Sequence, residues 1–310
     1  MDAYGDSKTF SQERLNTLRS KLSGITNDSI IVTCGSYARR EARKESDIDF
    51  FIIEPHASAG SNEELLSNAG KIIGSVGPIE PSPSGAFAQI EHEEGMLVNI
   101  GGDNDTNQKL TRRMLFLLEG DWLANETGFN DIRRKILERY VSSVVSDHAL
   151  SLFLLNDVIR YYRTMTVDYE FKTSEGENPK PWGIRNIKLV FSRKLLYASG
   201  LFSVAMTANL TRDKKIEELE RLLKLPVLDR MIDICGKAKM ENVSRSYDRF
   251  LEKMADPNTR NHLKSLGNNE RDDLLFRDLK NESHRFTREL LKLFEGTFDT
   301  THPIRRAVMF

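Results

Sequence analysis

The stretch that decides the fold is Ile30-Ile31-Val32-Thr33-Cys34-Gly35-Ser36, followed after ten residues by Asp47-Ile48-Asp49-Phe50-Phe51-Ile52-Ile53. The apolar, β-branched run predicts a short buried strand that ends in a small-residue turn. A helix is expected over 36–43, and the second run predicts another strand. Because side chains two apart on a strand project to the same face, Asp47 and Asp49 should present their carboxylates together.

This combination suits a nucleoside triphosphate and its metal ions. Mg²⁺ takes one or two carboxylates together with phosphate and water oxygens. Glycine lets a backbone approach an anion closely, and N–H groups at a helix start attract phosphate. Gly35 and Ser36 are therefore candidate phosphate-binding residues, and Asp47 and Asp49 candidate metal ligands. The alternative is that the acids cap a turn at an ordinary strand-to-helix corner.

The rest of the chain changes from mixed to helical periodicity. A helix is expected over 10–23, another over 63–73, and a third strand over Ala86–Glu91. After a turn cluster at 101–107, helices are expected over 109–120, 128–145, 148–166, 183–200, 214–224, 226–237, 241–255 and 268–296. The sequence predicts an α+β fold: a catalytic domain over 1–120 with a short mixed sheet and helices on one face, then an all-helical domain over 121–310.

Composition narrows the class of protein. The 310 residues carry 29% charged side chains and a formal net charge of −1, so no global field attracts nucleic acid. Cys34 and Cys235 fit no metal or redox spacing and are expected to be buried free thiols. No secretory signal or membrane-spanning stretch is recognisable in the sequence, which predicts a cytoplasmic protein without a membrane partner. Its oligomeric state does not follow from the sequence.

The segment from Gly35 to Arg43, with Ser46-Asp47-Ile48-Asp49 after it, resembles the signature of the polymerase-beta-like nucleotidyltransferase superfamily. The resemblance implies that Gly35 and Ser36 hold the triphosphate. It also implies that Asp47 and Asp49 bind two Mg²⁺ ions, for which Mn²⁺ can substitute. In that superfamily a third acid on a later strand helps to activate the attacking hydroxyl.

The third acid is the open question of the sequence. Glu91, at the end of the expected strand, is the first candidate for this catalytic role. Glu93 and Glu94 are close alternatives, and Asp103 is a remoter one. Asn99 stands in an acid-like position but cannot accept a proton from the acceptor. The alternative for Glu91 is a solvated acid at a strand end.

A second group of candidates lies in the helical half, where no acid occurs between Asn178 and Arg212. Arg185 and Lys188 are one helical turn apart and are candidates for binding triphosphate oxygens, close to Trp182 as a platform for a base. Asp157 is a candidate for contacting base or ribose. The alternatives are a solvated basic face and, for Asp157, a tie between helices.

The segment Pro181-Trp182-Gly183-Ile184-Arg185-Asn186-Ile187-Lys188 resembles the region after the catalytic domain in bacterial uridylyltransferases of nitrogen-signal proteins. The resulting hypothesis is a Mg²⁺-dependent nucleotidyltransferase whose helical domain closes the cleft. It would move a nucleoside monophosphate from an NTP to a hydroxyl, first of a protein side chain, second of an RNA end. The rival hypotheses are a non-catalytic nucleotide sensor or toxin-partner module and a nucleotide second-messenger synthase.

Overall fold

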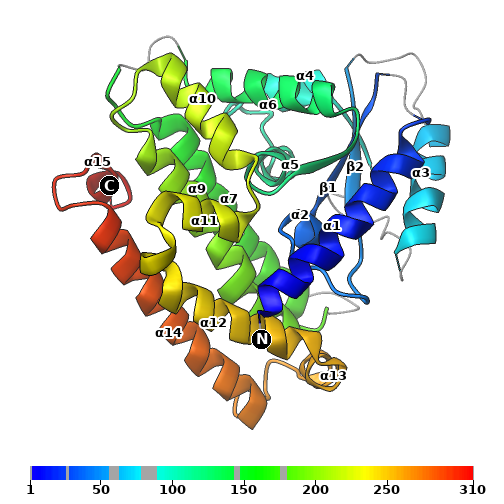
Figure 1. Cartoon of the computed structure of the whole chain (residues 1–310), viewed down its shortest axis with the longest axis vertical. Helices are drawn as coiled ribbons and strands as arrows, with labels where there is room; N and C mark the ends of the chain where they lie inside the picture. The colour runs from blue at the N-terminus through cyan, green and yellow to red at the C-terminus, as the bar shows by residue number, and fades with distance from the viewer. Residues whose placement is uncertain are drawn as a thin grey trace. The chain divides into compact units, whose positions relative to one another are not determined.

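The computed structural model describes residues 2–25, 28–55, 63–77, 89–142, 147–174 and 180–309 (Figure 1). The chain divides into two compact units. We call Tyr4–Asp147 with Leu210–Pro226 the sheet unit, and Met1–Ala3, His148–Asn209 and Val227–Phe310 the helical unit. Each unit is described by itself.

The sheet unit contains all four strands of the described residues, together with seven helices. Its elements are α1 (Ala3–Leu22), β1 (Ile30–Cys34), α2 (Gly35–Ala38), β2 (Asp49–Glu54), α3 (Glu63–Val76), β3 (Ile90–His92), α4 (Glu93–Leu97), α5 (Asn107–Leu118), β4 (Asp121–Ala124), α6 (Glu126–Tyr140) and α10 (Arg212–Leu223).

The sheet is mixed and has the order β3-β2-β1-β4. β1 runs antiparallel to both β2 and β4, and β2 pairs in parallel with β3. Cys34 stands opposite Asp49 at the end of the β1–β2 ladder. This register brings the turn after β1 to the beginning of the strand that carries the acids.

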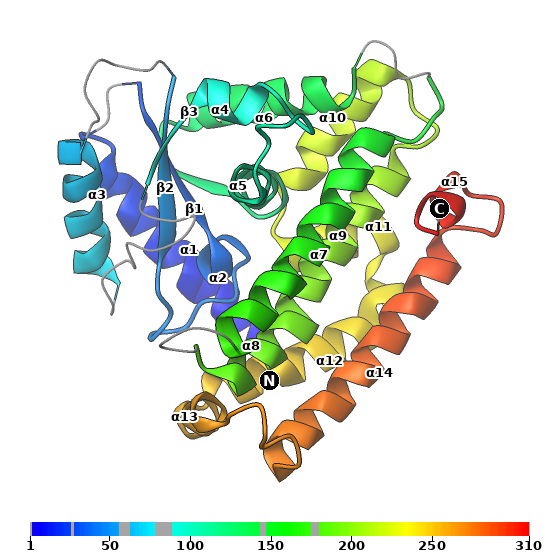
Figure 2. The ribbon, with the colours of Figure 1, turned by 180° about the vertical axis from the view of Figure 1, so that it is seen from behind.

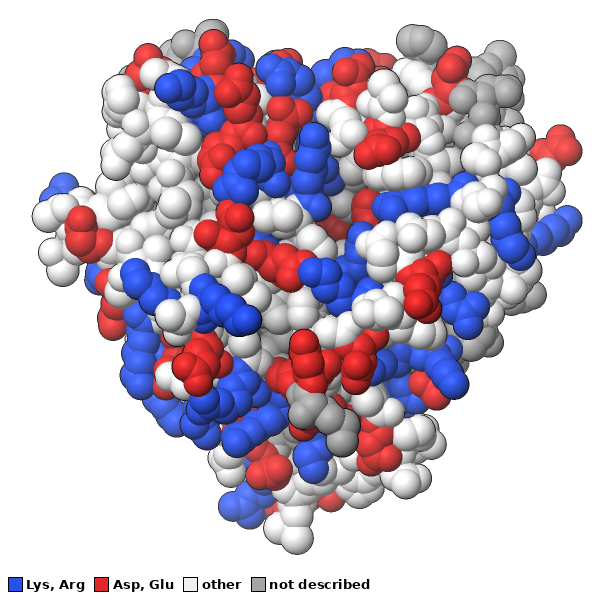
Figure 3. Space-filling view, in the orientation of Figure 1, with Lys and Arg blue, Asp and Glu red and all other residues white. Residues whose placement is uncertain are grey.

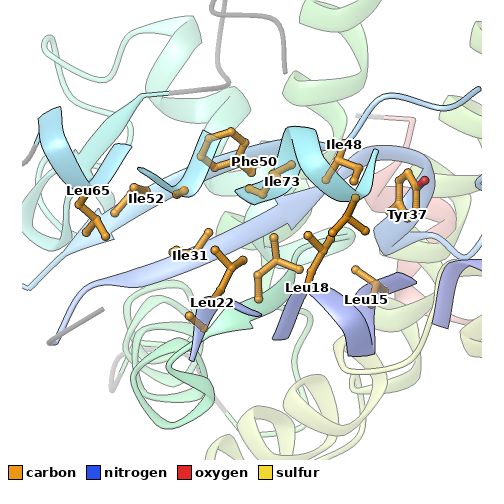
Figure 4. Packing of buried hydrophobic residues seen from close by; sticks show 14 of the residues in the cluster. Leu15, Leu18, Leu22, Ile31, Tyr37, Ile48, Phe50, Ile52, Leu65 and Ile73 are labelled. Atoms are coloured by element: carbon orange, nitrogen blue, oxygen red, sulfur yellow. The ribbon is translucent and has the colours of Figure 1, made fainter. Parts of the chain in front are cut away.

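One face of the sheet packs on α1 and α3 (Figure 4). Alternate residues of β2 point there, so that Phe50 and Ile52 join Ile31 in a buried cluster with Leu18 of α1 and Ile73 of α3. Ile48, just before β2, belongs to the same cluster. The period-two alternation leaves Asp47 and Asp49 for the opposite side.

The opposite face is covered as well. Val32, Phe51 and Ile53 are all fully buried on that side, and α5 and α6 pack against β1. The expectation of helices on one face only is therefore wrong. The reason is β4, which the sequence pattern did not predict: the chain continues from α5 through β4 on the sheet edge into α6.

Other local expectations are met in part. The helix expected over 36–43 is only four residues long, since the chain leaves it at Arg39 and Arg40, and Arg40 has a left-handed backbone (φ 63°). Of the third expected strand, Ile90 and Glu91 lie in β3. Residues 86–88 of that expected strand lie outside the described residues.

The helical unit is built from α7 (Leu152–Ser174), α8 (Trp182–Lys188), the π-helical segment η1 (Leu189–Arg193), α9 (Lys194–Met206), α11 (Val227–Cys235), α12 (Lys237–Ala255), α13 (Pro257–Ser265), α14 (Leu274–Thr297) and α15 (Pro303–Ala307). Figure 2 shows α7 beside α9 and α12 beside α14, and both pairs are in contact. The short helices α13 and α15 were not predicted from the sequence.

Trp182–Met206 forms one continuous apolar helix at the centre of this unit. Ile184, Ile187, Phe191, Leu195 and Ala198 are all buried, as the helical periodicity predicted. By length and hydropathy this is the one candidate membrane span among the described residues, but 67% of its apolar window is buried inside the protein. It serves as the core helix of the unit.

The two compact units are divided differently from the predicted domains at 120/121. β4 and α6 continue the sheet unit, and α10 returns to it by packing on α6. As a division between catalytic and substrate-binding parts, the boundary at residue 120 stays a prediction.

Candidate active site

The turn after β1 brings Gly35 against the first residue of β2. Gly35 has φ +73°, a conformation that side chains disfavour, and a Cβ placed on it would lie 2.6 Å from Asp49 Oδ2. Thr33 Oγ1 donates a hydrogen bond to the Asp49 carbonyl (2.8 Å), which fixes the strand end. A side chain at position 35 would therefore displace the Asp49 carboxylate.

The two acids flank a buried apolar residue. Asp47 is exposed and Asp49 is half-buried, whereas Ile48 between them is buried in the core. Burial raises the pKa of the nearby Tyr37 hydroxyl, and the charge of Asp47 adds a smaller effect of the same sign. The Asp49 carboxylate thus lies beside the turn, and both acids have access to solvent.

Ser36 follows as the second residue of α2 and is half-buried. The backbone of the turn is fixed by two hydrogen bonds: Arg39 N–H donates to the Gly35 carbonyl (3.0 Å), and Glu41 N–H donates to the Ser36 carbonyl (2.8 Å). The Ser36 hydroxyl is therefore carried by a rigid backbone, next to a glycine.

A buried acid that the sequence analysis missed supports this turn. Glu119, at the end of α5, has a fully buried side chain; its Oε1 accepts the Gly35 N–H (2.9 Å), and its Oε2 accepts a hydrogen bond from Arg39 Nη1 (2.5 Å). Arg39 also pairs with Glu41 through its Nε (2.9 Å). The sequence offered one signal for this acid: Glu119 and Gly120 follow an apolar helix and stand just before the short apolar run 122–124.

A second ion-pair cluster fixes the far end of the turn. Asp121 Oδ2 lies 2.7 Å from Arg40 Nη2 and 2.9 Å from Arg19 Nη2. These contacts join β4 to the residues after α2 and to α1. The Gly-Ser segment is thus held between the two clusters, whose acids are Glu119 and Asp121.

The family model described as a nucleotidyltransferase domain matches residues 14–84. Residues 14–84 form a nucleotidyltransferase domain of the polymerase-beta-like superfamily. The matched region contains Gly35, Ser36, Asp47 and Asp49. It ends before Glu91 and before the helical unit, so it does not test the roles predicted there or the likeness to uridylyltransferases. Among curated proteins, none matches the chain.

The acids of the site fit the metal chemistry of such domains. Asp47 and Asp49 offer hard carboxylate oxygens, and Mg²⁺ binds in enzymes through one or two carboxylates plus substrate phosphates. Within the ranges that the structure describes, no three His, Cys, Asp or Glu side chains gather as an ion-binding group. Two protein carboxylates are therefore what this pair can contribute, and a bound triphosphate would supply further oxygens.

The structure does not bring Glu91 to this pair. Glu91 stands opposite Ile53, four residues beyond Asp49, which is about 13 Å along the strand. Its carboxylate forms an ion pair with Arg112 of α5, and Arg112 also donates to Gln89 Oε1 (2.7 Å). The catalytic role of Glu91 stays a prediction, and the contacts that the structure gives it are those of a structural ion pair.

The three nucleotide-binding candidates of the helical half all lie in the helical unit. Arg185 and Lys188 are on α8, half-buried and exposed respectively, one turn apart as predicted. Asp157 of α7 is buried, with Arg160 Nη1 3.9 Å from its Oδ1. Nucleotide binding by these residues stays a prediction, and the burial of Asp157 is typical of a tie between helices.

Charge of both signs is interspersed on the face of the molecule seen in Figure 3. This distribution agrees with the net charge of −1. Any anionic substrate must therefore be attracted by a local group of cations rather than by the surface as a whole.

Proposed function

We propose that the protein is a Mg²⁺-dependent nucleotidyltransferase that moves a nucleoside monophosphate from an NTP to a hydroxyl group. The observation that supports it most strongly is the approach of the Asp49 carboxylate to the Gly35 turn, with the exposed Asp47 two residues before it. The fully buried Glu119 holds this turn in place before any substrate arrives, and such preorganisation is what phosphoryl and nucleotidyl transfer require.

In this proposal each residue has a defined task. Asp47 and Asp49 hold the metal ions, which neutralise phosphate charge when bound. Ser36 and the backbone of the Gly-Ser turn position the triphosphate. The acceptor oxygen forms a bond to the α-phosphorus, the bond to the bridging α–β oxygen breaks, and pyrophosphate leaves with the electron pair. The hydroxyl proton passes to a carboxylate, for which Glu91 is the predicted group.

The finer parts of the proposal are as follows. The acceptor is a protein hydroxyl in the first place and an RNA end in the second. The setting is cytoplasmic, which agrees with two buried free cysteines and with an apolar helix that is mostly buried. Arg185 and Lys188 would bind phosphate oxygens of the donor.

The proposal is tested by pyrophosphate release from each of the four NTPs, with Mg²⁺ or Mn²⁺ and cell lysate as the acceptor source. The wild type should release pyrophosphate. Asp47→Asn and Asp49→Asn should each lower the rate by at least about a hundredfold, because each replaces a metal-binding carboxylate by a neutral amide of the same size. Asp131→Asn, an exposed acid on α6, is the matched control. An α-³²P-labelled NTP would then identify the labelled species as protein, RNA or small molecule.

A second candidate function is a non-catalytic nucleotide sensor. It is favoured by two observations: Glu91 is engaged by Arg112, and the Gly35 N–H is already engaged by Glu119. A sensor would bind Mg²⁺–NTP without releasing pyrophosphate in any lysate. Binding that requires Asp47 and Asp49, without turnover, would decide for the sensor.

A further inference from the structure

The helical unit contains a pocket of its own, whose lining includes none of Gly35, Ser36, Asp47 and Asp49. It has a volume of about 320 Å³ and lies between α7, α8 and the N-terminal half of α14, whose arrangement is visible in Figure 2. This volume is at the lower end of the range of ligand-binding pockets. Its lining residues are Tyr169, Glu170, Trp182, Asn186, Arg271, Phe276, Arg277, Lys280 and Asn281.

Aromatic side chains form one wall of the pocket. Trp182 of α8 and Phe276 of α14 are buried and in contact, with ring centroids 4.6 Å apart. The Arg271 guanidinium lies 5.8 Å from the centre of the Trp182 ring. A planar ring of a ligand can therefore be placed against apolar surface close to a cation.

Arg271, Arg277 and Lys280 form another wall, which therefore carries positive charge. In the portion of the helical unit that the structure describes, no carboxylate lies within 4.0 Å of the charged groups of Arg271, Arg277 or Lys280. Partial burial lowers the pKa of Lys280, and the nearby Arg271 adds to this effect; Lys194 has a lowered pKa for the same reasons, with Lys280 as its charged neighbour. An anion beside Lys280 would favour its charged form.

A fixed amide orients this cluster. Lys280 Nζ donates to Asn186 Oδ1 (3.1 Å), and Asn186 Nδ2 donates to the Tyr169 hydroxyl (2.9 Å). The chain Tyr169–Asn186–Lys280 holds the ammonium group at a defined place in the wall. At the rim, Glu170 and Asn281 are exposed. A carboxylate and an amide can pair with the amino groups and carbonyls of a base edge, which a simple phosphoaryl group lacks.

We propose that this pocket binds a nucleoside monophosphate, with its base against Trp182 and Phe276 and its phosphate on Arg271, Arg277 and Lys280. The site shares no residue with the Gly35–Asp49 site and does not depend on the function proposed for it. Among the described lining residues Glu170 is the single acid, and in this arrangement it faces the base rather than the phosphate. An anion in the pocket would raise the pKa of Lys280, so binding should weaken at high pH.

The experiment uses the full-length chain with Trp122→Phe, which leaves Trp182 as the sole tryptophan. AMP, GMP, CMP and UMP are titrated in EDTA, so that the metal-dependent site is silent. Saturable quenching of Trp182 fluorescence is expected for at least one of them. Its Kd should be at least about tenfold lower than that of the matching nucleoside and of inorganic phosphate, since only the nucleotide makes both sets of contacts.

Two variants and one control assign the binding to the pocket. Arg271→Gln and Lys280→Gln should each weaken binding by at least about tenfold, which is the loss of one charge-assisted hydrogen bond. Arg288→Gln, an exposed cation later on α14 and outside the pocket, should leave Kd unchanged. Arg277→Gln, a second exposed site, replaces any variant whose circular dichroism shows misfolding.

Failure of this inference is separable from failure of the proposed function. The double variant Asp47→Asn/Asp49→Asn should keep its monophosphate affinity while losing pyrophosphate release. The inference is overturned if monophosphates bind no better than phosphate and nucleoside, if Arg271→Gln and Lys280→Gln bind like the wild type, or if the double variant loses binding.

Discussion

At the scale of single residues, Gly35 carries the tightest constraint in the candidate site. Gly35→Ala would place a methyl group 2.6 Å from Asp49 Oδ2 and hold alanine in a left-handed conformation, which costs about 1–2 kcal/mol. The displaced carboxylate should lower pyrophosphate release by about a hundredfold, the usual effect of misplacement by an ångström.

The matched control for Gly35→Ala is Gly70→Ala. Gly70 lies in α3, and a Cβ there meets nothing within 4 Å. This variant should be as active as the wild type and slightly more stable, because alanine favours the helix. If Gly35→Ala and Gly70→Ala are equally active, the close approach of Gly35 to Asp49 is not needed for activity.

Glu119 offers a second test at this scale, through stability. Glu119→Ala removes the carboxylate from a buried ion pair with Arg39. Loss of one partner of such a pair typically lowers the free energy of unfolding by about 3–5 kcal/mol. Glu119→Gln keeps an acceptor for the Gly35 N–H and should cost less. Urea unfolding measures both, and the exposed Glu138→Ala on α6 should stay within about 1 kcal/mol of wild type. If both Glu119 variants unfold at the same urea concentration as the wild type, Glu119 does not stabilise the turn.

At the scale of elements, close packing of helices depends on Gly183. Its N–H donates to the Leu266 carbonyl (3.4 Å), and a Cβ there would lie 2.6 Å from the Leu263 carbonyl oxygen. Gly183→Ala should therefore separate α8 from α13 and cost about 1–3 kcal/mol by overpacking. Hydrogen exchange should accelerate in α13. Gly296→Ala in α14, where a Cβ meets nothing within 4 Å, should not accelerate it.

The start of α15 gives a pH dependence with a definite sign. His302 Nδ1 accepts the Ile304 N–H (3.2 Å), which requires an unprotonated nitrogen. Burial lowers the pKa of His302 below 6.5, Asp299 opposes the shift, and Arg305 adds to it. The folded state thus binds this proton less readily than the unfolded chain, so the contribution is present above about pH 6.5 and is lost as the pH falls.

The measurement compares urea unfolding at pH 7.5 and pH 5.5 for the wild type and His302→Asn. Asparagine keeps an N-cap acceptor without a titrating group. The wild type should lose more of its free energy of unfolding between these two pH values than the variant does. Identical losses would show that His302 does not contribute to the pH dependence.

At the scale of the whole molecule, the two units carry one tryptophan each. Trp122 lies on β4 of the sheet unit, with Arg19 3.9 Å from its ring centre, and Trp182 lies in the helical unit. In Trp182→Phe, Mg²⁺–NTP at a hundred times its Kd should raise the free energy of unfolding reported by Trp122 by about 2.7 kcal/mol. The same variant with Asp47→Asn and Asp49→Asn should show no such rise.

Local patterns predicted much of the fold because their causes are local. The β-branched run Ile30–Cys34 and the periodic apolar residues of Trp182–Met206 formed the expected elements, and the family match confirmed the nucleotidyltransferase domain. β4 escaped prediction because Asp121–Ala124 is too short to carry a pattern; pairing with β1 makes it a strand. Glu119 escaped for a similar reason, since its partner Gly35 is 84 residues away in the sequence.

The sequence by itself predicted the residues of the candidate site. Gly35-Ser36 and Asp47-Ile48-Asp49 are spaced so that one turn and one strand bring them together, and this needs only local geometry. The tertiary structure alone decided that Arg112 engages Glu91, that Glu119 holds the turn, and that Trp182 faces a cationic pocket with residues of α14. Each of these depends on contacts between segments far apart in the chain, which only packing brings within a few ångströms.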